Sequence, residues 1–180
     1  MGIKRFGDKN IKIRKVVKSD VKKAEKFREL INSLVEEDAK ILINKKISLR
    51  EEKDFLEGLL NMTKARKKVY LVAEFDDKII ATTSIEQQKG RGDHVGKFGI
   101  IVKNGYRGIG LGKFMMSEII KLAKKDLKPQ PKIISLDVFT DNTPAINLYK
   151  KMRFRKVAKI PKCRQYKGKL LDEFVMILEV

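Results

Sequence analysis

The spacing of hydrophobic positions changes its period several times along the chain and predicts a succession of strands and helices. Residues 11–17 (IKIRKVV) alternate apolar and basic side chains, as a half-buried strand does. Apolar residues then recur at every third or fourth position to about residue 37, which predicts a helix capped by Ser19. Ser48 and Glu51 form a capping box that starts a second helix, ending near residue 64.

The second half of the chain is richer in strands. Alternation at 69–75 and 79–86, joined by a tight turn, predicts a hairpin. We expect further strands at 95–102, 133–139, 155–160 and 171–179, a helix after the glycine-rich stretch at 104–114, and a short helix capped by Thr143 that ends near residue 152. The order β α α β β β α β α β β predicts an α/β fold: a mixed sheet of about seven strands flanked by about four helices. We expect one domain, residues 11–180, after a short tail at 1–10.

Composition narrows the classes of partner and of chemistry. The 42 Lys and Arg residues against 23 Asp and Glu give a net charge of +19, which favours polyanionic partners such as nucleic acid, ribosomes, acidic proteins or a phosphate-rich cofactor. With one cysteine, Cys163, and one histidine, His94, an internal disulfide or a His/Cys zinc site is not expected, and we expect no metal. The absence of a signal-like or membrane-spanning apolar run predicts a cytoplasmic protein without a membrane partner. We expect a monomer or a homodimer.

The stretch NGYRGIGLGKF, residues 104–114, places glycines where a helix begins. Glycine there lets the main chain approach a ligand, and the first amides of a helix bind phosphate oxygens. A plain tight turn is the alternative. The spacing fits neither a P-loop nor a dinucleotide fingerprint, because Arg107 stands where the first P-loop glycine belongs and the glycines follow one another at alternate positions.

The pattern that fits is Arg-x-x-Gly-x-Gly, made by Arg107, Gly110 and Gly112, between a strand and an amphipathic helix. Here the sequence resembles the GNAT superfamily of acetyl-CoA-dependent N-acetyltransferases. The stretch LDVFTDNTPAINLYKKMRF, residues 136–154, is similar to the second signature of that family. The resemblance covers nearly the whole chain and implies a splayed central sheet, acetyl-CoA as cosubstrate and direct attack by an amine.

The resemblance also implies which residues bind acetyl-CoA. The backbone of Ile100, Ile101 and Val102 would pair with the pantetheine arm as an extra strand would. Asn142 would hydrogen-bond that arm, with an ordinary turn residue as the alternative. The pyrophosphate would lie on the turn and the start of the helix, made by Arg107, Gly108, Ile109, Gly110, Leu111, Gly112 and Lys113.

Catalytic roles are implied less completely. Tyr149 matches a tyrosine that protonates the departing thiolate in many relatives, while a core tyrosine is the alternative. Relatives with a catalytic glutamate carry it near the position of Lys97, and a lysine cannot readily serve as the base. Glu86 and His94 remain as candidates, although Glu86 could pair with a surface lysine and His94 could be a solvated loop residue. Cys163 is expected to be a bystander.

The acceptor is expected beside the loop at 161–171, which lies within a stretch of ten basic and no acidic residues from 142 to 171. We hypothesise a positive lip that prefers acceptors with carboxylates, contacted by Tyr166. The first interpretation is acetylation of a protein, at an N-terminal amine or a lysine, with ribosome association. The second is acetylation of a small amine or amino-acid-like molecule. The third is an inactive RNA- or ribosome-binding module on the same fold.

Overall fold

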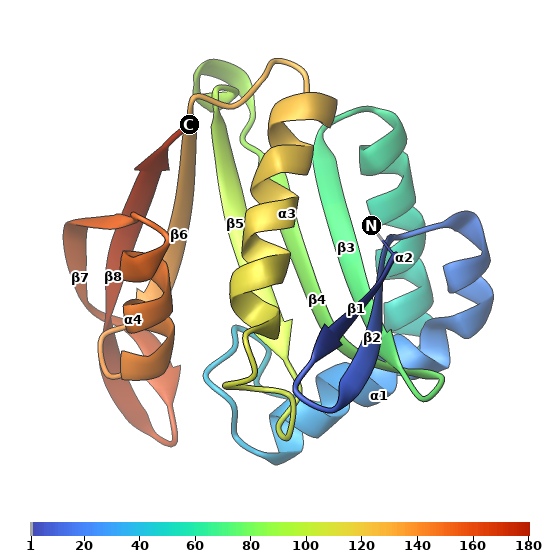
Figure 1. The fold of residues 1–180 in the computed structure, drawn as a ribbon. Helices are drawn as coiled ribbons and strands as arrows, with labels where there is room; N and C mark the ends of the chain where they lie inside the picture. The colour runs from blue at the N-terminus through green and yellow to red at the C-terminus, as the bar shows by residue number, and fades with distance from the viewer. Residues whose placement is uncertain (1) are drawn as a thin grey trace.

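The protein, described by a computed structural model over residues 2–180, is an eight-stranded sheet with helices on both faces (Figure 1). The strands are β1 Gly2–Phe6, β2 Lys9–Lys15, β3 Lys68–Phe75, β4 Lys78–Gln87, β5 Val95–Val102, β6 Ile133–Phe139, β7 Arg155–Tyr166 and β8 Lys169–Glu179. The helices are α1 Ala24–Glu36, α2 Leu49–Lys64, α3 Leu111–Asp126 and α4 Thr143–Lys151, with short 3₁₀ turns η1 Lys18–Lys23 and η2 Gly90–Gly92. The mixed α/β fold with four helices is confirmed.

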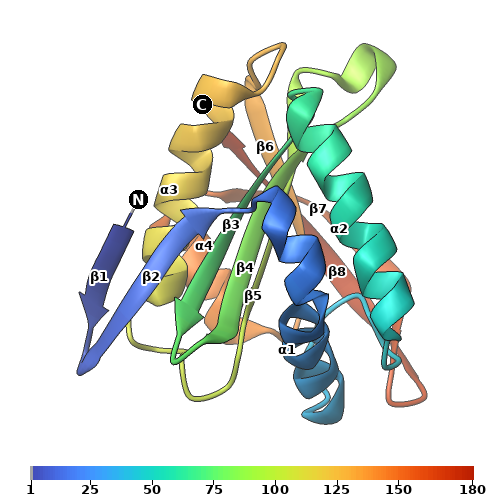
Figure 2. The ribbon, with the colours of Figure 1, turned by 90° about the vertical axis from the view of Figure 1, so that its right-hand side faces the viewer.

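The strand order is β1-β2-β3-β4-β5-β6-β8-β7, and every neighbouring pair is antiparallel except β5 with β6. α3 and α4 lie on one face and α1 and α2 on the other, as the view in Figure 2 shows. Each face has its own core. Leu111, Met115 and Ile119 of α3 are buried against one face of the sheet, and Phe27 and Leu30 of α1 belong to the cluster on the other face.

The prediction of a tail at residues 1–10 is wrong. β1 pairs with β2 over five residues, so the sheet has eight strands instead of about seven. The hairpin is held to the body by Phe6, which is buried and packs edge-on against Phe114 of α3 with ring centroids 5.6 Å apart. That contact joins residues far apart in the sequence, and the hydrophobic pattern of a short, otherwise exposed strand does not reveal it.

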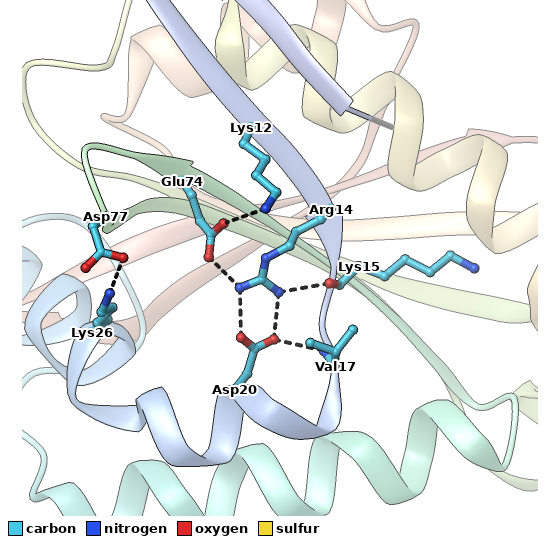
Figure 3. Close-up of polar contacts among 8 residues, drawn as sticks. All are labelled: Lys12, Arg14, Lys15, Val17, Asp20, Lys26, Glu74 and Asp77. Atoms are coloured by element: carbon cyan, nitrogen blue, oxygen red, sulfur yellow. Dashed lines mark hydrogen bonds and ion pairs between the residues drawn. The ribbon is translucent and has the colours of Figure 1, made fainter.

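The first helix begins differently from the prediction. Val17, not Ser19, precedes the opening 3₁₀ turn, and its amide donates to the Asp20 carboxylate at 2.8 Å. Asp20 is buried because Arg14 of β2 donates to both of its oxygens at 2.7 Å, and Arg14 also reaches Glu74 of β3 (Figure 3). A bidentate ion pair of this kind fixes the start of α1 against the sheet.

The basic loop expected at 161–171 is mostly strand. β7 continues to Tyr166 and turns into β8 through Lys167 and Gly168, both with positive φ, which is the geometry of a two-residue hairpin turn. The pairing of β7 with β8 is irregular between Ile160 and Arg164, the region that holds a proline on this edge strand. The part of the acid-free stretch that follows α4 therefore forms a hairpin at the sheet edge.

No helix among residues 2–180 is both long enough and apolar enough to cross a membrane. Over the same residues, His, Cys, Asp and Glu side chains do not gather in a group of three or more that could hold a metal ion.

Candidate active site

The two halves of the sheet separate after three residue pairs. β5 and β6 pair only through residues 95–97 and 133–135, whereas β4 follows β5 to Val102 and β8 follows β6 to Phe139. A cleft of about 1640 Å³ opens at this fork and is lined from one face by α1 and α2 and from the other by α3 and α4. The splay expected between these strands is confirmed.

A glycine-rich turn closes one end of the cleft. Gly108 and Gly110 line it and have φ of 78° and 89°, in the left-handed region where glycine carries no penalty. The first amides of α3 have no intrahelical partner, as in any helix. The N-cap is Gly110, which has no side chain to accept hydrogen bonds from them. These amides stand at the positive end of the helix dipole, an arrangement that suits an anion.

Gly112 has a different reason to be glycine. A Cβ built there would lie 3.5 Å from Leu148 and 3.9 Å from Ile100, which are ordinary van der Waals distances, and its φ is not in the left-handed region. The folded chain alone would therefore accept alanine. Gly112 lines the cleft, where a residue without a Cβ leaves room for a ligand to approach the backbone.

Arg107 ties the turn to two other elements. Its Nε donates to the Val102 carbonyl at 2.8 Å, so this carbonyl at the end of β5 is already used. One of its terminal nitrogens forms an ion pair with Glu37, just beyond α1. Lys113 also lines the cleft, whereas the Leu111 side chain is buried in the core beneath the turn.

Asn142, rather than Thr143, is the N-cap of α4. Its Oδ1 accepts from the Ala145 amide at 3.4 Å, which leaves the NH₂ end of the side chain as a possible donor into the cleft that Asn142 lines. The prediction for the cap was one residue too late, since both residue types are good caps and only geometry separates them.

Tyr149 lies in the last turn of α4 and lines the cleft at the fork. The side chain is 8% exposed and packs edge-on against Phe98 of β5, with centroids 6.1 Å apart. Its hydroxyl makes no hydrogen bond within residues 2–180, yet Tyr149 lines the cleft. Burial raises the pKa of Tyr149 to about 12, so the hydroxyl keeps its proton at neutral pH.

The two candidate bases differ in position. Glu86 lines the cleft but is 43% exposed and pairs with Lys68 at 2.8 Å, the alternative foreseen for it. His94 lies before β5, where its carbonyl accepts from the Lys132 amide at 2.8 Å, and it is not part of the cleft lining. Lys97 does line the cleft, and its ammonium forms an ion pair with Asp137 across the fork.

Tyr166 does not line the cleft, but it contacts a segment that does. Its hydroxyl donates to the Asp38 carbonyl at 2.7 Å, and its ring packs edge-on against Phe139 at 6.1 Å. Asp38 opens the connection between α1 and α2, residues 37–48, which contributes Ala39 to Ile43 to the cleft. Lys40 in that connection pairs with Asp141 at 2.7 Å, so this contact and that of Tyr166 both join the segment to the β6-β8-β7 side of the fork.

One buried carboxylate in the cleft was not anticipated. Glu52 of α2 is 3% exposed, lines the cleft, and has no ion-pair or hydrogen-bond partner for its side chain in the part of the chain that the structure describes. Burial raises the pKa of Glu52 to about 7. The sequence did carry a signal, since Glu52, Leu56 and Leu59 fall on one helix face, but a charge there reads as an interruption of the pattern.

Comparison with known proteins identifies the family. The model of the acetyltransferase (GNAT) family matches residues 31–154, which include the fork, the glycine turn and α4. The chain belongs to the GNAT acetyltransferase family. An L-amino acid N-acetyltransferase from Escherichia coli strain K12 is 34% identical over 107 residues, which are 59% of this chain and 65% of the relative.

Solved GNAT structures share the fold. A ribosomal-protein-S5-alanine acetyltransferase from Vibrio fischeri has a TM-score of 0.82 at 18% identity, covering 98% of this chain and 96% of that one. The yncA structure from Salmonella typhimurium, solved with its cofactor acetyl-CoA, has a TM-score of 0.78 at 20% identity, covering 94% and 93%. At these identities the likeness establishes the fold.

GNAT acetyltransferases use acetyl-CoA, and the residues at the fork suit it. The unpartnered amides at the start of α3 suit a pyrophosphate, and Gly112 leaves room for close approach. Past residue 97 the β5 edge no longer pairs with β6, so its backbone is open to an extended ligand. The cleft therefore fits the cosubstrate of this family.

Proposed function

We propose that this GNAT protein transfers an acetyl group from acetyl-CoA to the α-amine of an amino acid or of a peptide N-terminus. The observation that carries the proposal is the fork, where an anion-binding helix start, an open strand edge and the protonated Tyr149 hydroxyl line one cleft. The thioester supplies an activated acetyl group and a thiol leaving group.

The residues at the fork divide the work. The helix-start amides and Arg107 bind the pyrophosphate, and the β5 edge at Ile100 and Ile101 aligns the extended arm. Asn142 donates from its amide nitrogen. Tyr149 gives its proton to the departing sulfur, which is useful because a thiol with a pKa of about 8.5 leaves poorly as a bare thiolate at neutral pH.

The choice of an α-amine rests on what the printed acceptors of the similar proteins share. The sequence relative is named for L-amino acids, and similar structures include a ribosomal-protein-alanine enzyme from Brucella melitensis. The two names print an L-amino acid and an alanine, and each of these carries its amine on the carbon next to a carbonyl group. The cleft wall on the α1 and α2 side is mostly apolar, formed by Phe27, Leu30, Ile31 and Phe55, although Glu51 and Glu52 of α2 also line it. This apolar part suits an acceptor side chain without charge. Ribosome association remains a proposal that rests on the net charge of +19.

The test is a thiol-release assay with acetyl-CoA and three groups of acceptors. The groups are the free L-amino acids, a peptide beginning with alanine, and the same peptide with a blocked N-terminus and one internal lysine. We expect turnover with the first or second group and none with the third. Turnover with the blocked peptide alone would replace the α-amine by a lysine, and a protein that binds RNA but neither binds acetyl-CoA nor releases thiol would be the inactive module.

A further inference from the structure

Glu52 is the buried acid that the fold leaves without a compensating charge. The other buried acids, Asp20 and Glu173, are held by Arg14 at 2.7 Å and by Arg164 at 2.6 Å. Glu52 has no such partner among residues 2–180, and an unpaired buried carboxylate costs free energy. Its place in the cleft of an acetyltransferase points to a use for that carboxyl group.

The surroundings of Glu52 keep its carboxyl group reactive. The neighbouring Glu51 is engaged in the capping box, where its carboxylate accepts from the Ser48 amide at 2.7 Å. On β3, Lys68 directs its ammonium to Glu86 instead. The α1 side chains that line the cleft are apolar. No cationic side chain of α1, α2 or β3 forms an ion pair with Glu52.

Two further titratable groups face the same region. Tyr70 of β3 is buried, and its pKa is raised by burial, with the charges of Glu52 and Asp20 adding to the effect. Asp20 of η1 already has its charge matched by Arg14. The phenol of Tyr70 therefore stays protonated, and Glu52 is the group in this set that changes its ionisation near neutral pH.

A row of residues leads from Glu52 to the fork. Tyr70 pairs with Ser84, and Ser84 pairs with Gly99, so the three positions lie side by side on one face of β3, β4 and β5. With strands about 4.8 Å apart, the row spans about 10 Å. Gly99 lies two residues past Lys97, where β5 and β6 part, and all these residues line the same cleft as Glu52.

We propose that Glu52 is the general base of the reaction and takes the proton of the acceptor amine through a water held beside Ser84. The inference rests on the proposed function. The amine nitrogen bonds to the acetyl carbon while the carbon–sulfur bond breaks and its electron pair leaves with sulfur. One N–H proton passes through the water to the Glu52 carboxylate, and the Tyr149 proton goes to sulfur. Solvent in the cleft then takes up the first proton and restores the second, so the products are an amide and a thiol.

Glu52 fits this role better than the other candidates near the fork. The carboxylate of Glu86 already faces an ammonium and is largely solvated, the ammonium of Lys97 is bound by Asp137, and His94 lies outside the cleft. A base with a pKa close to the working pH takes a proton efficiently and releases it again.

The experiment compares wild type, Glu52→Gln and Glu57→Gln with the most active acceptor of the thiol-release panel at saturating acetyl-CoA. Glu57 is an exposed glutamate on the same helix, outside the cleft lining, and supplies the matched control. In wild type, log kcat/KM for the acceptor should rise with a slope of two below about pH 7, because both the amine and Glu52 must lose a proton. Glu52→Gln should show a slope of one and a rate at least ~100-fold lower at pH 8.

The affinity for acetyl-CoA, measured by calorimetry, should be the same in all three proteins. A Glu52→Gln protein with the slope and rate of wild type would overturn the assignment of the base. A loss of rate together with a loss of acetyl-CoA binding would also overturn it, because the residue would then serve the structure of the cleft. A folded wild-type protein that acetylates no amine would overturn the proposed function and this inference together. If wild type is active and Glu52→Gln has the same rate and slope, only the inference is overturned.

Discussion

The Tyr166 hydroxyl donates to the carbonyl of Asp38 at 2.7 Å, although 128 positions separate the two residues. The bond joins the tip of the β7–β8 hairpin to the connection after α1, and the ion pair of Lys167 with Asp38 at 2.9 Å lies beside it. The connection after α1, which lines the cleft, and the tip of the hairpin are thereby joined. Ala39 to Ile43 of this connection line the cleft, so we expect the link to help position the cleft wall.

Tyr166→Phe should weaken acceptor binding and leave the cosubstrate site intact. Removal of one hydrogen bond costs about 1 kcal/mol, which corresponds to a rise in the acceptor KM of roughly 5-fold if the link positions the wall. The dissociation constant of acetyl-CoA should not change. An unaltered acceptor KM would mean that the 37–48 connection keeps its position without the hairpin.

Gly112→Ala should change the affinity for acetyl-CoA without lowering the stability of the fold. A Cβ at this helical position makes only ordinary contacts, so the melting temperature should hold or rise. Acetyl-CoA affinity should fall at least ~10-fold, because the methyl group stands where the backbone is expected to approach the pyrophosphate.

Gly58→Ala, in the exposed middle of α2 with no atom near the added Cβ, is the control for a helical glycine. It should raise stability by about 0.5–1 kcal/mol and leave acetyl-CoA affinity alone. If Gly112→Ala bound acetyl-CoA as well as this control does, the anion site would have to lie elsewhere on the turn.

Tyr149→Phe should lower kcat without weakening acetyl-CoA binding. The ring packs against Phe98 and its hydroxyl makes no bond in the described part of the chain, so phenylalanine should preserve the fold. The loss of a proton donor is expected to reduce kcat by about 100-fold. Since the pKa of Tyr149 lies at about 12, wild type should show no loss of activity from this group up to about pH 10. A variant with the kcat of wild type would make Tyr149 a core residue.

The positive lip is smaller than the sequence implied. Arg164 pairs with Glu173 and Lys167 with Asp38, so half of the four charges at Lys162, Arg164, Lys167 and Lys169 are compensated. Charge reversal of Lys162 and Lys169, which form no ion pair within residues 2–180, isolates the effect on the acceptor. We expect the preference for an acidic over a neutral peptide to drop several-fold at low salt and the difference to shrink at high salt. If the preference is the same before and after charge reversal, the hypothesis that a positive lip selects acceptors with carboxylates is wrong.

The parts of the site that could be predicted from the sequence are those encoded within a short stretch. The glycine turn before α3 and the helix that carries Tyr149 follow from local signals, the glycine spacing and the Thr143-Pro144 start, although the cap of that helix is Asn142 and not Thr143. β1 was missed because its burial comes from Phe114, more than a hundred residues away. Glu52 was missed for the same reason, since its role depends on which surface of the protein α2 covers. A single charged residue on an apolar helix face does not reveal that surface.

Glu52→Gln should also change stability in a way that depends on pH. The folded pKa of Glu52, about 7, lies above the ordinary value of 4.5, so the native state holds a proton that the unfolded chain has lost between these values. Wild type therefore loses stability as the pH rises from 4.5 to 7, and the penalty is complete above 7. At about 1.4 kcal/mol per pH unit the full interval gives about 3 kcal/mol, and partial solvation of the cleft reduces this to about 2. Glutamine carries no such penalty, so the variant should be more stable than wild type by about 2 kcal/mol at pH 8 and equal to it at pH 4, in urea titrations of both proteins. A constant difference across that range would mean that Glu52 has the same pKa in the folded and the unfolded chain. Burial would then not hold its proton up to neutral pH, and a carboxylate with an ordinary pKa would be a weaker base for the amine.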